Sequence, residues 1–315
     1  MTTCLLVYLY TCILGVVMDK IVECVPNFSE GRRAEVVDEI VGAMTLPGVK
    51  ILDREMDADH NRSVITLAGE PRAVEDAAFR GIAVAARLID LDVHRGEHPR
   101  IGATDVVPFV PVLGVTMDDC VAIARRLGQR VARELDIPVY LYERAATRPE
   151  RRDLAYIRRG EYETLKQEIA TNPDRAPDYG PKRIGKAGAT VIGARPYLIA
   201  FNVNLATSDL NIAKEIAATI REKNGGLPSV KAKGFMLHEK NIAQVSMNLT
   251  DFTVTGMLTA FNTVKAEAEK RGVQVLESEI VGLVPLDALT QLAAQALKLP
   301  ALSASQVVET KLFGE

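Results

Sequence analysis

The chain has 315 residues, of which 48% are hydrophobic and 25% are charged, and its formal net charge is −3. This composition is typical of a globular protein that is long enough for two domains. The small net charge and an aromatic content of 5%, without Trp, argue against nucleic-acid binding, which uses basic surfaces and aromatic stacking platforms. An anionic ligand would therefore need a local cluster of cations.

An apolar run from Cys4 to Val17 opens the sequence, and a second methionine, Met18, follows it directly. The run is shorter than the roughly 20 apolar residues that a membrane-spanning helix needs, and it lacks the basic start and the cleavage site of a secretory signal. The residues after Met18 have the pattern of a strand and a turn at the front of a domain. We therefore expect residues 1–17 to be a non-native extension, with Met18 as the natural start.

Cysteine usage gives no sign of a disulfide framework or a zinc site. The four cysteines, Cys4, Cys12, Cys24 and Cys120, form no Cys-x-x-Cys pair and have no histidine at zinc-site spacing. Isolated cysteines of this kind are usually buried packing residues of a protein in the reducing cytosol. The sequence thus predicts a cytoplasmic protein with neither a nucleic-acid nor a membrane partner.

Helices alternate with short apolar strands along the first half of the chain. Hydrophobic periodicity predicts strands at 21–25, 49–52, 63–68, 105–112 and 139–142, and helices at 33–44, 70–91 and 118–134. Residues 27–31 have the composition of a turn between the first strand and the first helix. Pro108 and Pro111 interrupt the fourth strand and place it near a sheet edge or a bulge.

Residues 144–186 differ from the rest, because they are dense in charge, Pro and Gly and contain one helical pattern at 162–170. A long irregular segment inside a compact protein more often has a function than not. Regular alternation resumes at Tyr197, with strands predicted at 198–205, 230–237, 243–249 and 273–281, and helices at 209–223, 254–271 and 286–298. Ser208 is the expected cap of the first of these helices.

The two halves of the chain resemble each other. Each has the order strand, helix, strand, strand, helix, strand, and Val49 and Val64 are 15 positions apart, as are Val230 and Val245. A duplicated unit of this order fits a ferredoxin-like topology, although two α/β segments can also look alike by chance. We therefore predict an α+β protein of two tandem ferredoxin-like α/β-sandwich subdomains, at residues 18–196 and 197–315.

Comparison of the halves isolates one loop, His94-Arg-Gly-Glu-His-Pro-Arg100. Phe79 and Val107 are 28 positions apart, whereas their counterparts Phe261 and Val281 are 20 apart, so the first half carries about eight extra residues around this loop. Its glycine and proline mark a turn, and loops on a rigid scaffold are where function concentrates. The alternative is a solvated, charged loop without a function.

The chemistry of this loop rests on His98. Histidine can accept and return a proton near neutral pH, which suits a transfer between two amines, because the incoming amine loses a proton and the departing amine gains one. Cations that could hold substrate carboxylates are Arg62, Arg100 and Lys186. Acidic residues that could orient a cationic amidine or the histidine are Glu30, Glu55 and Asp57. Taken singly, any of these charged residues is more often a solvated surface group.

Other chemistries have less support. His94 and His98 have the spacing of a helical zinc pair, but the glycine and proline around them disfavour that helix and no third ligand is evident, so we expect no metal. The sequence has no Gly-x-Ser-x-Gly nucleophile motif. The glycines of residues 185–189 lack the context of a dinucleotide motif, yet they could bring backbone amides close to a ligand.

Several motifs in chain order resemble the formiminotransferase family. They are Glu23-Cys-Val-Pro-Asn-Phe-Ser-Glu-Gly31, His94-x-Gly-Glu-His-Pro-Arg-Ile-Gly-Ala103, Gly188-Ala-Thr-Val-Ile-Gly-Ala194, Phe201-Asn-Val-Asn204, Glu239-Lys-Asn241 and Val281-Gly-Leu-Val-Pro285. The likeness extends from about Met18 to Lys298. Several motifs in order are far more specific than any one of them.

The resemblance implies transfer of a formimino group from N-formimino-L-glutamate to N5 of tetrahydrofolate, as in histidine breakdown. It also implies a substrate groove between two ferredoxin-like subdomains, with tetrahydrofolate as co-substrate and no metal. The family's catalytic histidine lies in the Glu-His-Pro-Arg motif and corresponds to His98. Substrate binding is assigned to Asn27 of the first motif, to the charged residues named above, and to a folate-contacting segment made of Gly180, Pro181, Lys182, Arg183, Ile184, Gly185, Lys186, Ala187 and Gly188.

The chain departs from the family pattern in two places. The folate segment is shorter and more basic than in the animal bifunctional enzyme, through Lys182, Arg183 and Lys186, and Glu55 stands where an aspartate is expected. That enzyme continues into a cyclodeaminase domain, whereas this chain resembles the transferase part alone, so a separate cyclodeaminase could be a partner. We further expect a homodimer. Two alternatives stay open: a related enzyme that uses 5-formyltetrahydrofolate or another formyl or formimino donor, and a folate-binding protein without catalysis.

Overall fold

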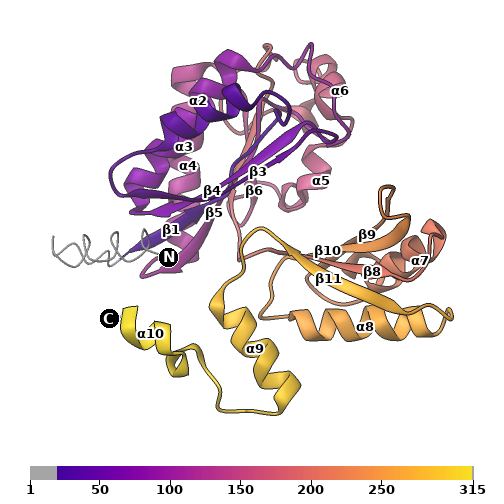
Figure 1. Ribbon diagram of the computed structural model, residues 1–315. Helices are drawn as coiled ribbons and strands as arrows, with labels where there is room; N and C mark the ends of the chain where they lie inside the picture. The colour runs from indigo at the N-terminus through magenta and orange to yellow at the C-terminus, as the bar shows by residue number, and fades with distance from the viewer. Residues whose placement is uncertain (1–19, 314–315) are drawn as a thin grey trace. The chain divides into compact units, whose positions relative to one another are not determined.

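The computed structural model describes residues 20–313, which form two compact units (Figure 1). The first unit ends at Arg195 and the second begins at Pro196. Residues 1–17, predicted to be a non-native extension, lie outside the described residues. Between residues 20 and 313, no helix is long and apolar enough to cross a membrane.

A seven-stranded sheet organises the described part of the first unit. Its strands are β1 (Ile21–Cys24), β2 (Asn27–Phe28), β3 (Val49–Asp57), β4 (Arg62–Gly69), β5 (Thr104–Leu113), β6 (Val139–Glu143) and β7 (Thr190–Ala194). β1 and β2 are consecutive strands that occupy the same position in the sheet. Both pair antiparallel with β4 on one side and with β5 on the other. β3 pairs with β4 at one edge, while β7 and then β6 extend the sheet beyond β5 by parallel pairing.

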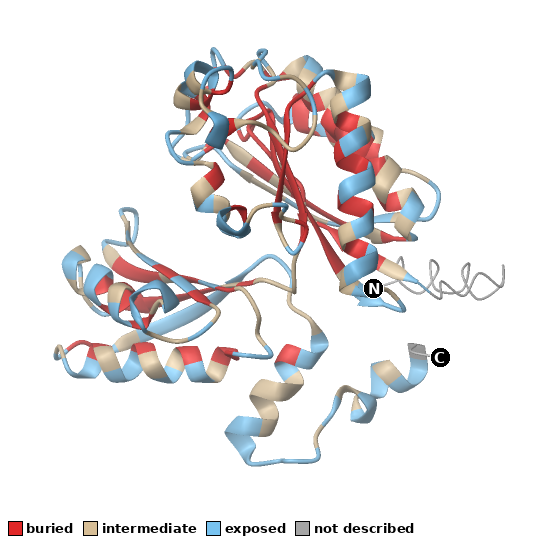
Figure 2. Cartoon of the chain, turned by 180° about the vertical axis from the view of Figure 1, so that it is seen from behind, coloured by how far each residue is buried: buried red, intermediate tan, exposed pale blue. Residues whose placement is uncertain are grey.

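Three amphipathic helices lie on one side of this sheet: α2 (Ala34–Met44), α3 (Pro71–Leu88) and α4 (Met117–Leu135) (Figure 1). Their apolar residues share one core with alternate residues of the strands, and the strands are largely buried (Figure 2). α4 begins at a capping box, in which Thr116 Oγ1 accepts a hydrogen bond from the Asp119 N–H and the Asp119 carboxylate accepts one from the Thr116 N–H. Cys24 and Cys120 are buried in this core, as predicted for packing residues, while Cys4 and Cys12 lie outside the described residues.

The segment predicted to be irregular, residues 144–186, packs on the opposite side of the sheet. It contains η1 (Pro149–Arg152), α5 (Leu154–Ile157), α6 (Glu161–Glu168) and η2 (Pro173–Arg175). Ile157 and Leu165 share a small second core with Tyr140 of β6 and Val191 of β7, and no residue of β3 or β4 belongs to it. The helical pattern predicted at 162–170 is confirmed as α6. The other three turns are too short to show a hydrophobic period.

The second unit, like the first, contains a sheet with helices packed against one side. Its elements are β8 (Ile199–Leu205), α7 (Leu210–Ile220), η3 (Glu222–Asn224), β9 (Val230–Leu237), β10 (Ile242–Leu249), α8 (Met257–Glu269) and β11 (Val275–Val281), followed by α9 (Leu286–Leu297), η4 (Ala304–Gln306) and α10 (Val308–Phe313). The described strands form an antiparallel sheet of order β11–β8–β10–β9. α7 and α8 share one core with Phe201 and Val203, so both helices cover the same side of the sheet. Asn202 and Asn204 therefore face the other side.

The predicted internal repeat is present in the order of the elements. The series β1, α2, β3, β4, α3, β5 corresponds to β8, α7, β9, β10, α8, β11. In each series the last strand pairs with the first, the first with the third and the third with the second. The α+β class is confirmed, whereas the substrate groove between the units stays a prediction.

Several local expectations differ from the structure. β5 is not an edge strand, because β1 and β2 flank it on one side and β7 on the other; the bulge alternative holds, since the β1–β5 register shifts beside Val22, which pairs with Pro111. The cap of α7 is Asp209 rather than Ser208, because the Asp209 carboxylate accepts the hydrogen bond from the Asn211 N–H. α3 ends at Leu88, before the predicted position 91. The short strands β2 and β7 were not predicted at all.

Candidate functional site

Three residues predicted from the sequence lie together on β2, β4 and the loop that follows α3. Arg62, at the start of β4, donates a hydrogen bond from Nη1 to His98 Nε2 at 3.1 Å, and another to Asn27 Oδ1 of β2 at 3.3 Å. Because an arginine N–H can only donate, Nε2 is the accepting nitrogen of His98 and the ring proton is assigned to Nδ1. The half-buried His98 thus presents a basic nitrogen that can take up a proton.

Sheet register brings further predicted residues to the same face. Asn27 pairs with Val64, Val64 pairs with Glu55, and Arg62 pairs with Asp57. Paired residues on neighbouring strands share a face, as do residues two positions apart on one strand. The intervening residues are buried on the side of α2 and α3, so these polar side chains occupy the opposite face.

The guanidinium of Arg62 is partly buried. Burial lowers the pKa of Arg62, and the nearby charge of Arg158 lowers it further, while Asp57 and Glu55 act in the opposite direction. A guanidinium remains charged at neutral pH despite such shifts. A cation beside His98 favours the neutral imidazole, which is the form that a general base requires.

Arg158 is a second cation beside Arg62, and it was not among the residues predicted from the sequence. Its guanidinium forms an ion pair with Asp105 of β5, whose other oxygen accepts a hydrogen bond from the Ile101 N–H at 2.8 Å. Arg158 Nε is buried, and within the described part of the chain it has no hydrogen-bond partner. Arg158 follows α5 in the irregular segment, where no motif or period distinguishes it from its neighbours.

The loop that carries His98 is fixed by Asn61, which ends the turn between β3 and β4. The Asn61 side chain accepts a hydrogen bond from the Gly31 N–H and donates one to the Arg95 carbonyl, both at 2.9 Å. The Asn61 carbonyl lies 2.9 Å from His94 Nε2. Asn61 has a positive φ of 47°, and Asn241 in the matching turn of the second unit has a φ of 51°. The recurrence of Asn at these two turns is a signal that the repeat comparison could have found.

His94 and Arg100 anchor the two ends of this loop. His94 is buried, its Nε2 donates to the Asn61 carbonyl, and its Nδ1 accepts a hydrogen bond from Arg100 Nε at 3.3 Å. Burial lowers the pKa of His94, in accord with a neutral ring whose two nitrogens are both engaged. The buried Arg100 guanidinium also binds Glu161 at 3.0 Å and Glu163 at 2.7 Å. These contacts anchor the loop, and the carboxylate grip of Arg100 that the sequence suggests stays a prediction.

Glu30 and Asp57 are also engaged within the protein. Glu30 accepts hydrogen bonds from the backbone N–H groups of Arg32 and Arg33, both at 2.9 Å, at the start of α2. Burial would raise the pKa of Glu30, but the hydrogen bonds from Arg33 and Arg32 outweigh it and lower that pKa. Asp57 accepts hydrogen bonds from the His60 backbone at 2.9 Å and from the His60 ring at 2.7 Å. Glu30 and Asp57 thus bind groups two or three positions away in the sequence. None of these hydrogen bonds orients either carboxylate toward His98.

The predicted folate segment, Gly180–Gly188, closes against both ends of the His98 loop. The Leu91 N–H donates to the Lys186 carbonyl, and the Ala103 N–H donates to the Ala187 carbonyl, both at 2.8 Å. A side chain at Gly102 would lie 1.9 Å from the Ala189 carbonyl oxygen, so glycine is required for this approach. The structure thus brings this segment and the His98 loop together.

The cations of the folate segment differ in their surroundings. Arg183 forms an ion pair with Asp136. Lys182 and Lys186 are exposed, so their ammonium groups can reach an anionic ligand. Within residues 20–313, no three His, Cys, Asp or Glu side chains are grouped as metal ligands would be.

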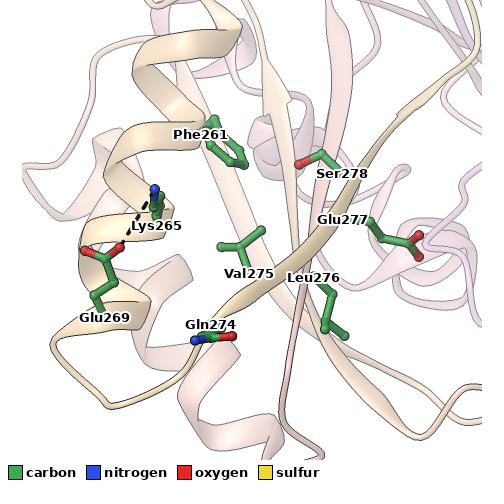
Figure 3. A pocket seen from close by; sticks show the side chains of 8 residues that line it. All are labelled: Phe261, Lys265, Glu269, Gln274, Val275, Leu276, Glu277 and Ser278. Carbon is green, nitrogen blue, oxygen red and sulfur yellow. Dashed lines mark ion pairs between the residues drawn. The ribbon is translucent and has the colours of Figure 1, made fainter.

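A pocket of about 460 Å³ lies in the second unit, between α8 and β11 (Figure 3). Phe261 and Lys265 contribute from α8, and Val275 and Ser278 from β11. The dashed line in Figure 3 joins Lys265 to Glu269, an ion pair within the helix. None of the residues predicted for the site lines this pocket, and it contains no histidine, so it is not the candidate catalytic site.

Comparison with known proteins decides the family. The model of the formiminotransferase domain's N-terminal subdomain matches residues 21–195, and the formiminotransferase domain model matches residues 200–309. The chain belongs to the formiminotransferase family. The resemblance inferred from the sequence motifs is thereby confirmed.

Relatives within the formiminotransferase family match nearly the whole chain. Glutamate formimidoyltransferase of Thermoplasma acidophilum is 52% identical over 296 residues, which cover 93% of this chain and 97% of that protein. The Streptococcus pyogenes protein of the same name is 46% identical over 300 residues, covering 94% of this chain and all of its relative (100%). The formimidoyltransferase-cyclodeaminase of Sus scrofa is 47% identical over 285 residues, which cover 88% of this chain but 52% of that longer protein. A solved microcompartment protein from Desulfitobacterium hafniense aligns over 86% of this chain and 99% of its own at 11% identity, and its TM-score of 0.23 is too low to bear on the fold.

Proposed function

We propose that this member of the formiminotransferase family is a glutamate formimidoyltransferase. It transfers the formimino group from N-formimino-L-glutamate to N5 of tetrahydrofolate, with 5-formiminotetrahydrofolate and L-glutamate as products. Similarity over nearly the full length to two proteins of that name carries this proposal. The contact between Arg62 and His98 Nε2 supports it, because it leaves a neutral imidazole for acid–base work.

The reaction divides into two proton transfers at His98. N5 of tetrahydrofolate attacks the formimino carbon, and a bond between the two forms while His98 Nε2 takes the proton from N5. The bond between that carbon and the glutamate nitrogen then breaks, and His98 returns its proton to the departing nitrogen. A single base whose protonation changes twice leaves the enzyme unaltered at the end of the cycle. For this step Arg62 must release the hydrogen bond that it donates to Nε2.

Cations around His98 provide the grip on the carboxylates of the substrates. Arg62 lies on the sheet face beside His98, and Arg158 keeps one buried N–H without a partner in the described residues. Lys182 and Lys186 are exposed on the segment that closes the His98 loop. Guanidinium and ammonium groups placed in this way bind carboxylates in an orientation that brings the reacting atoms together. Each unit is proposed to be a ferredoxin-like subdomain, with tetrahydrofolate as co-substrate.

An assay of the purified chain tests the function directly. The protein is incubated with tetrahydrofolate and N-formimino-L-glutamate, and formation of 5-formiminotetrahydrofolate is followed. In a parallel reaction, 5-formyltetrahydrofolate with L-glutamate replaces that pair, because a related enzyme of this fold would use the formyl group. We expect turnover in the first reaction at a rate well above that in the second. Tight folate binding without turnover in either reaction would favour a non-catalytic binding protein. The homodimeric state, the cytoplasmic location and a separate cyclodeaminase partner stay predictions.

A further inference from the structure

The helix-free face of the second sheet carries an ordered set of amide side chains. Two rows of paired residues cross this sheet: Glu279, Asn202, Ser246 and Lys233 in one, and Glu277, Asn204, Gln244 and Phe235 in the other. Both rows face away from α7 and α8. By the internal repeat, this face is the counterpart of the one that bears Asn27 and Arg62 in the first unit.

The amides are buried and joined by hydrogen bonds. Asn202, Asn204 and Gln244 are 8%, 1% and 4% exposed. Gln244 Nε2 donates to Asn204 Oδ1 and to Glu279 Oε1, both at 2.9 Å, and Asn204 Nδ2 donates to Glu277 Oε1 at 2.9 Å. A network of this kind fixes the orientation of each amide plane.

One atom of the network is left without a partner. Asn202 Nδ2 donates to Glu279 Oε1 at 3.0 Å, whereas Asn202 Oδ1 is buried and has no hydrogen-bond partner in the described residues. Turning the amide over would set its carbonyl oxygen against the Glu279 carboxylate, with no proton between two acceptors. The unpaired atom is therefore an acceptor, and a buried acceptor without a donor costs free energy until a donor arrives.

The charges around Asn202 restrict the chemistry of that donor. Two carboxylates of β11, Glu277 and Glu279, lie beside the amides. Hydrogen bonds from Asn204, and to a smaller extent from Lys240, lower the pKa of Glu277. Lys233, exposed on β9, lies two strands from Asn202, about 10 Å away at the usual strand spacing. A ligand that fits this face carries N–H groups at one end and a carboxylate at the other.

We propose, on the basis of the formimidoyltransferase function above, that Asn202 Oδ1 accepts a hydrogen bond from a planar N–C–N group of a substrate. Two substrates of the reaction contain such a group next to N–H donors and also bear carboxylates. One is the formimino end of N-formimino-L-glutamate, and the other is the aminopyrimidine ring of tetrahydrofolate. Asn202 is thus a specificity-determining residue, and the amide of Gln244 holds the Glu279 carboxylate that orients it.

The variant Asn202→Leu removes the acceptor with little change in side-chain volume. Glu279 keeps its hydrogen bond from Gln244 in this variant, and a polar atom without a partner is lost, so the midpoint of thermal unfolding is expected not to fall. The KM for one of the two substrates is expected to rise about 3–10-fold, the worth of one hydrogen bond. Asn262→Leu, the same change at an exposed position of α8, is the matched control and keeps wild-type KM values.

The readouts separate the possible outcomes. A rise in KM for N-formimino-L-glutamate alone identifies the formimino group as the ligand of Asn202, and a rise for tetrahydrofolate alone identifies the pterin. Unchanged KM values for both substrates in Asn202→Leu and in a second variant, Asn202→Ala, would overturn the proposal. Unchanged KM values together with a lower unfolding midpoint would also overturn it, because Asn202 would then serve stability alone.

Failure of the function itself gives a different result. If the wild-type protein transfers no formimino group, the proposed reaction is wrong whatever the variants do. Isothermal titration of tetrahydrofolate and of N-formimino-L-glutamate into the wild type and into Asn202→Leu then tests the contact without turnover. Equal dissociation constants for both proteins with each ligand would reject a role for Asn202, and a 3–10-fold weaker binding by the variant would support it.

Discussion

Arg62 Nη1 lies 3.1 Å from His98 Nε2, so a partly buried cation contacts the nitrogen that is proposed to accept a proton. The contact joins the start of a strand to a loop 36 residues further along the chain. It makes the protonation state of His98 depend on a neighbour that is itself a candidate ligand for substrate carboxylates. Binding of a carboxylate to Arg62 would release Nε2 for the reaction.

Loss of the imidazole tests the acid–base role. His98→Ala is expected to reduce kcat by about 10²–10⁴-fold, the usual contribution of a positioned acid–base group, while the free energy of unfolding changes little because His98 is half-buried on a loop. His238→Ala, at an exposed histidine in the β9–β10 turn, serves as the control. Near-normal turnover by folded His98→Ala would contradict the assignment.

Removal of the Arg62 charge tests the coupling to His98. The guanidinium disfavours a second positive charge on the ring, so Arg62→Met should move the acidic limb of the pH profile of kcat/KM to higher pH. The KM for at least one substrate should also rise about tenfold, because a charged hydrogen bond to a carboxylate is lost. The exposed Arg72→Met on α3 is the control. An acidic limb at the wild-type position would show that Arg62 does not tune the histidine.

Arg100→Met tests whether the loop is held by its buried guanidinium. Arg100 is 5% exposed and binds Glu161, Glu163 and His94. Its loss should lower the free energy of unfolding by about 1–3 kcal/mol, measured by urea denaturation, and should lower kcat as His98 loses its fixed position. Arg125→Met, at an exposed position of α4, should do neither. A variant that changes only the KM would instead indicate direct substrate binding by Arg100.

Glu23 predicts a dependence of stability on pH. This carboxyl on β1 is 5% exposed; burial raises its pKa from 4.5 to about 7, against the charge of Arg195, which lowers it. The folded state therefore keeps a proton that the unfolded chain releases near 4.5, so the stabilisation is complete below pH 4.5 and is lost as the pH rises to about 7.

Glu23→Gln removes this ionisation and should flatten the decline in the free energy of unfolding between pH 4.5 and pH 7. At pH 8 the variant should be more stable than the wild type by up to about 3 kcal/mol. The comparison uses urea denaturation across the pH range, with Glu239→Gln at an exposed turn position as the control. An unchanged slope in Glu23→Gln would show that Glu23 is ionised in the folded protein.

Periodicity and repetition predicted the fold well where they apply. The order of strands and helices follows from patterns within about 20 residues, and comparison of the two halves gives the duplication and the extra residues between α3 and β5. β7 has no such pattern: Thr190–Ala194 becomes a strand because β5 and β6 pair with it from both sides. The edge alternative for the strand that contains Pro108 fails for a similar reason, since the pairing partners of an internal strand are remote in the sequence.

The candidate site shows the same division. His98 stands out in the sequence because an insertion and a rare residue type coincide at one loop, and its catalytic role stays a prediction. The roles of Arg158 and Asn61 could not, because they depend on contacts to Asp105 and Arg95, 53 and 34 residues away. Arg100 was predicted as a substrate ligand because its charge is visible in the sequence, whereas its partners Glu161 and Glu163 are visible only in the fold.

The hydrogen bonds from Leu91 to Lys186 and from Ala103 to Ala187 bear on how the protein is made. His98 emerges from the ribosome well before residues 186 and 187, so its loop cannot take its final shape until almost the whole first unit has been synthesised. A fragment that ends in the irregular segment would contain the histidine and most of the sheet, and yet its loop would lack the chain that closes both ends. The final shape of this loop is therefore a late event in the folding of the first unit, even though His98 belongs to the first third of the chain.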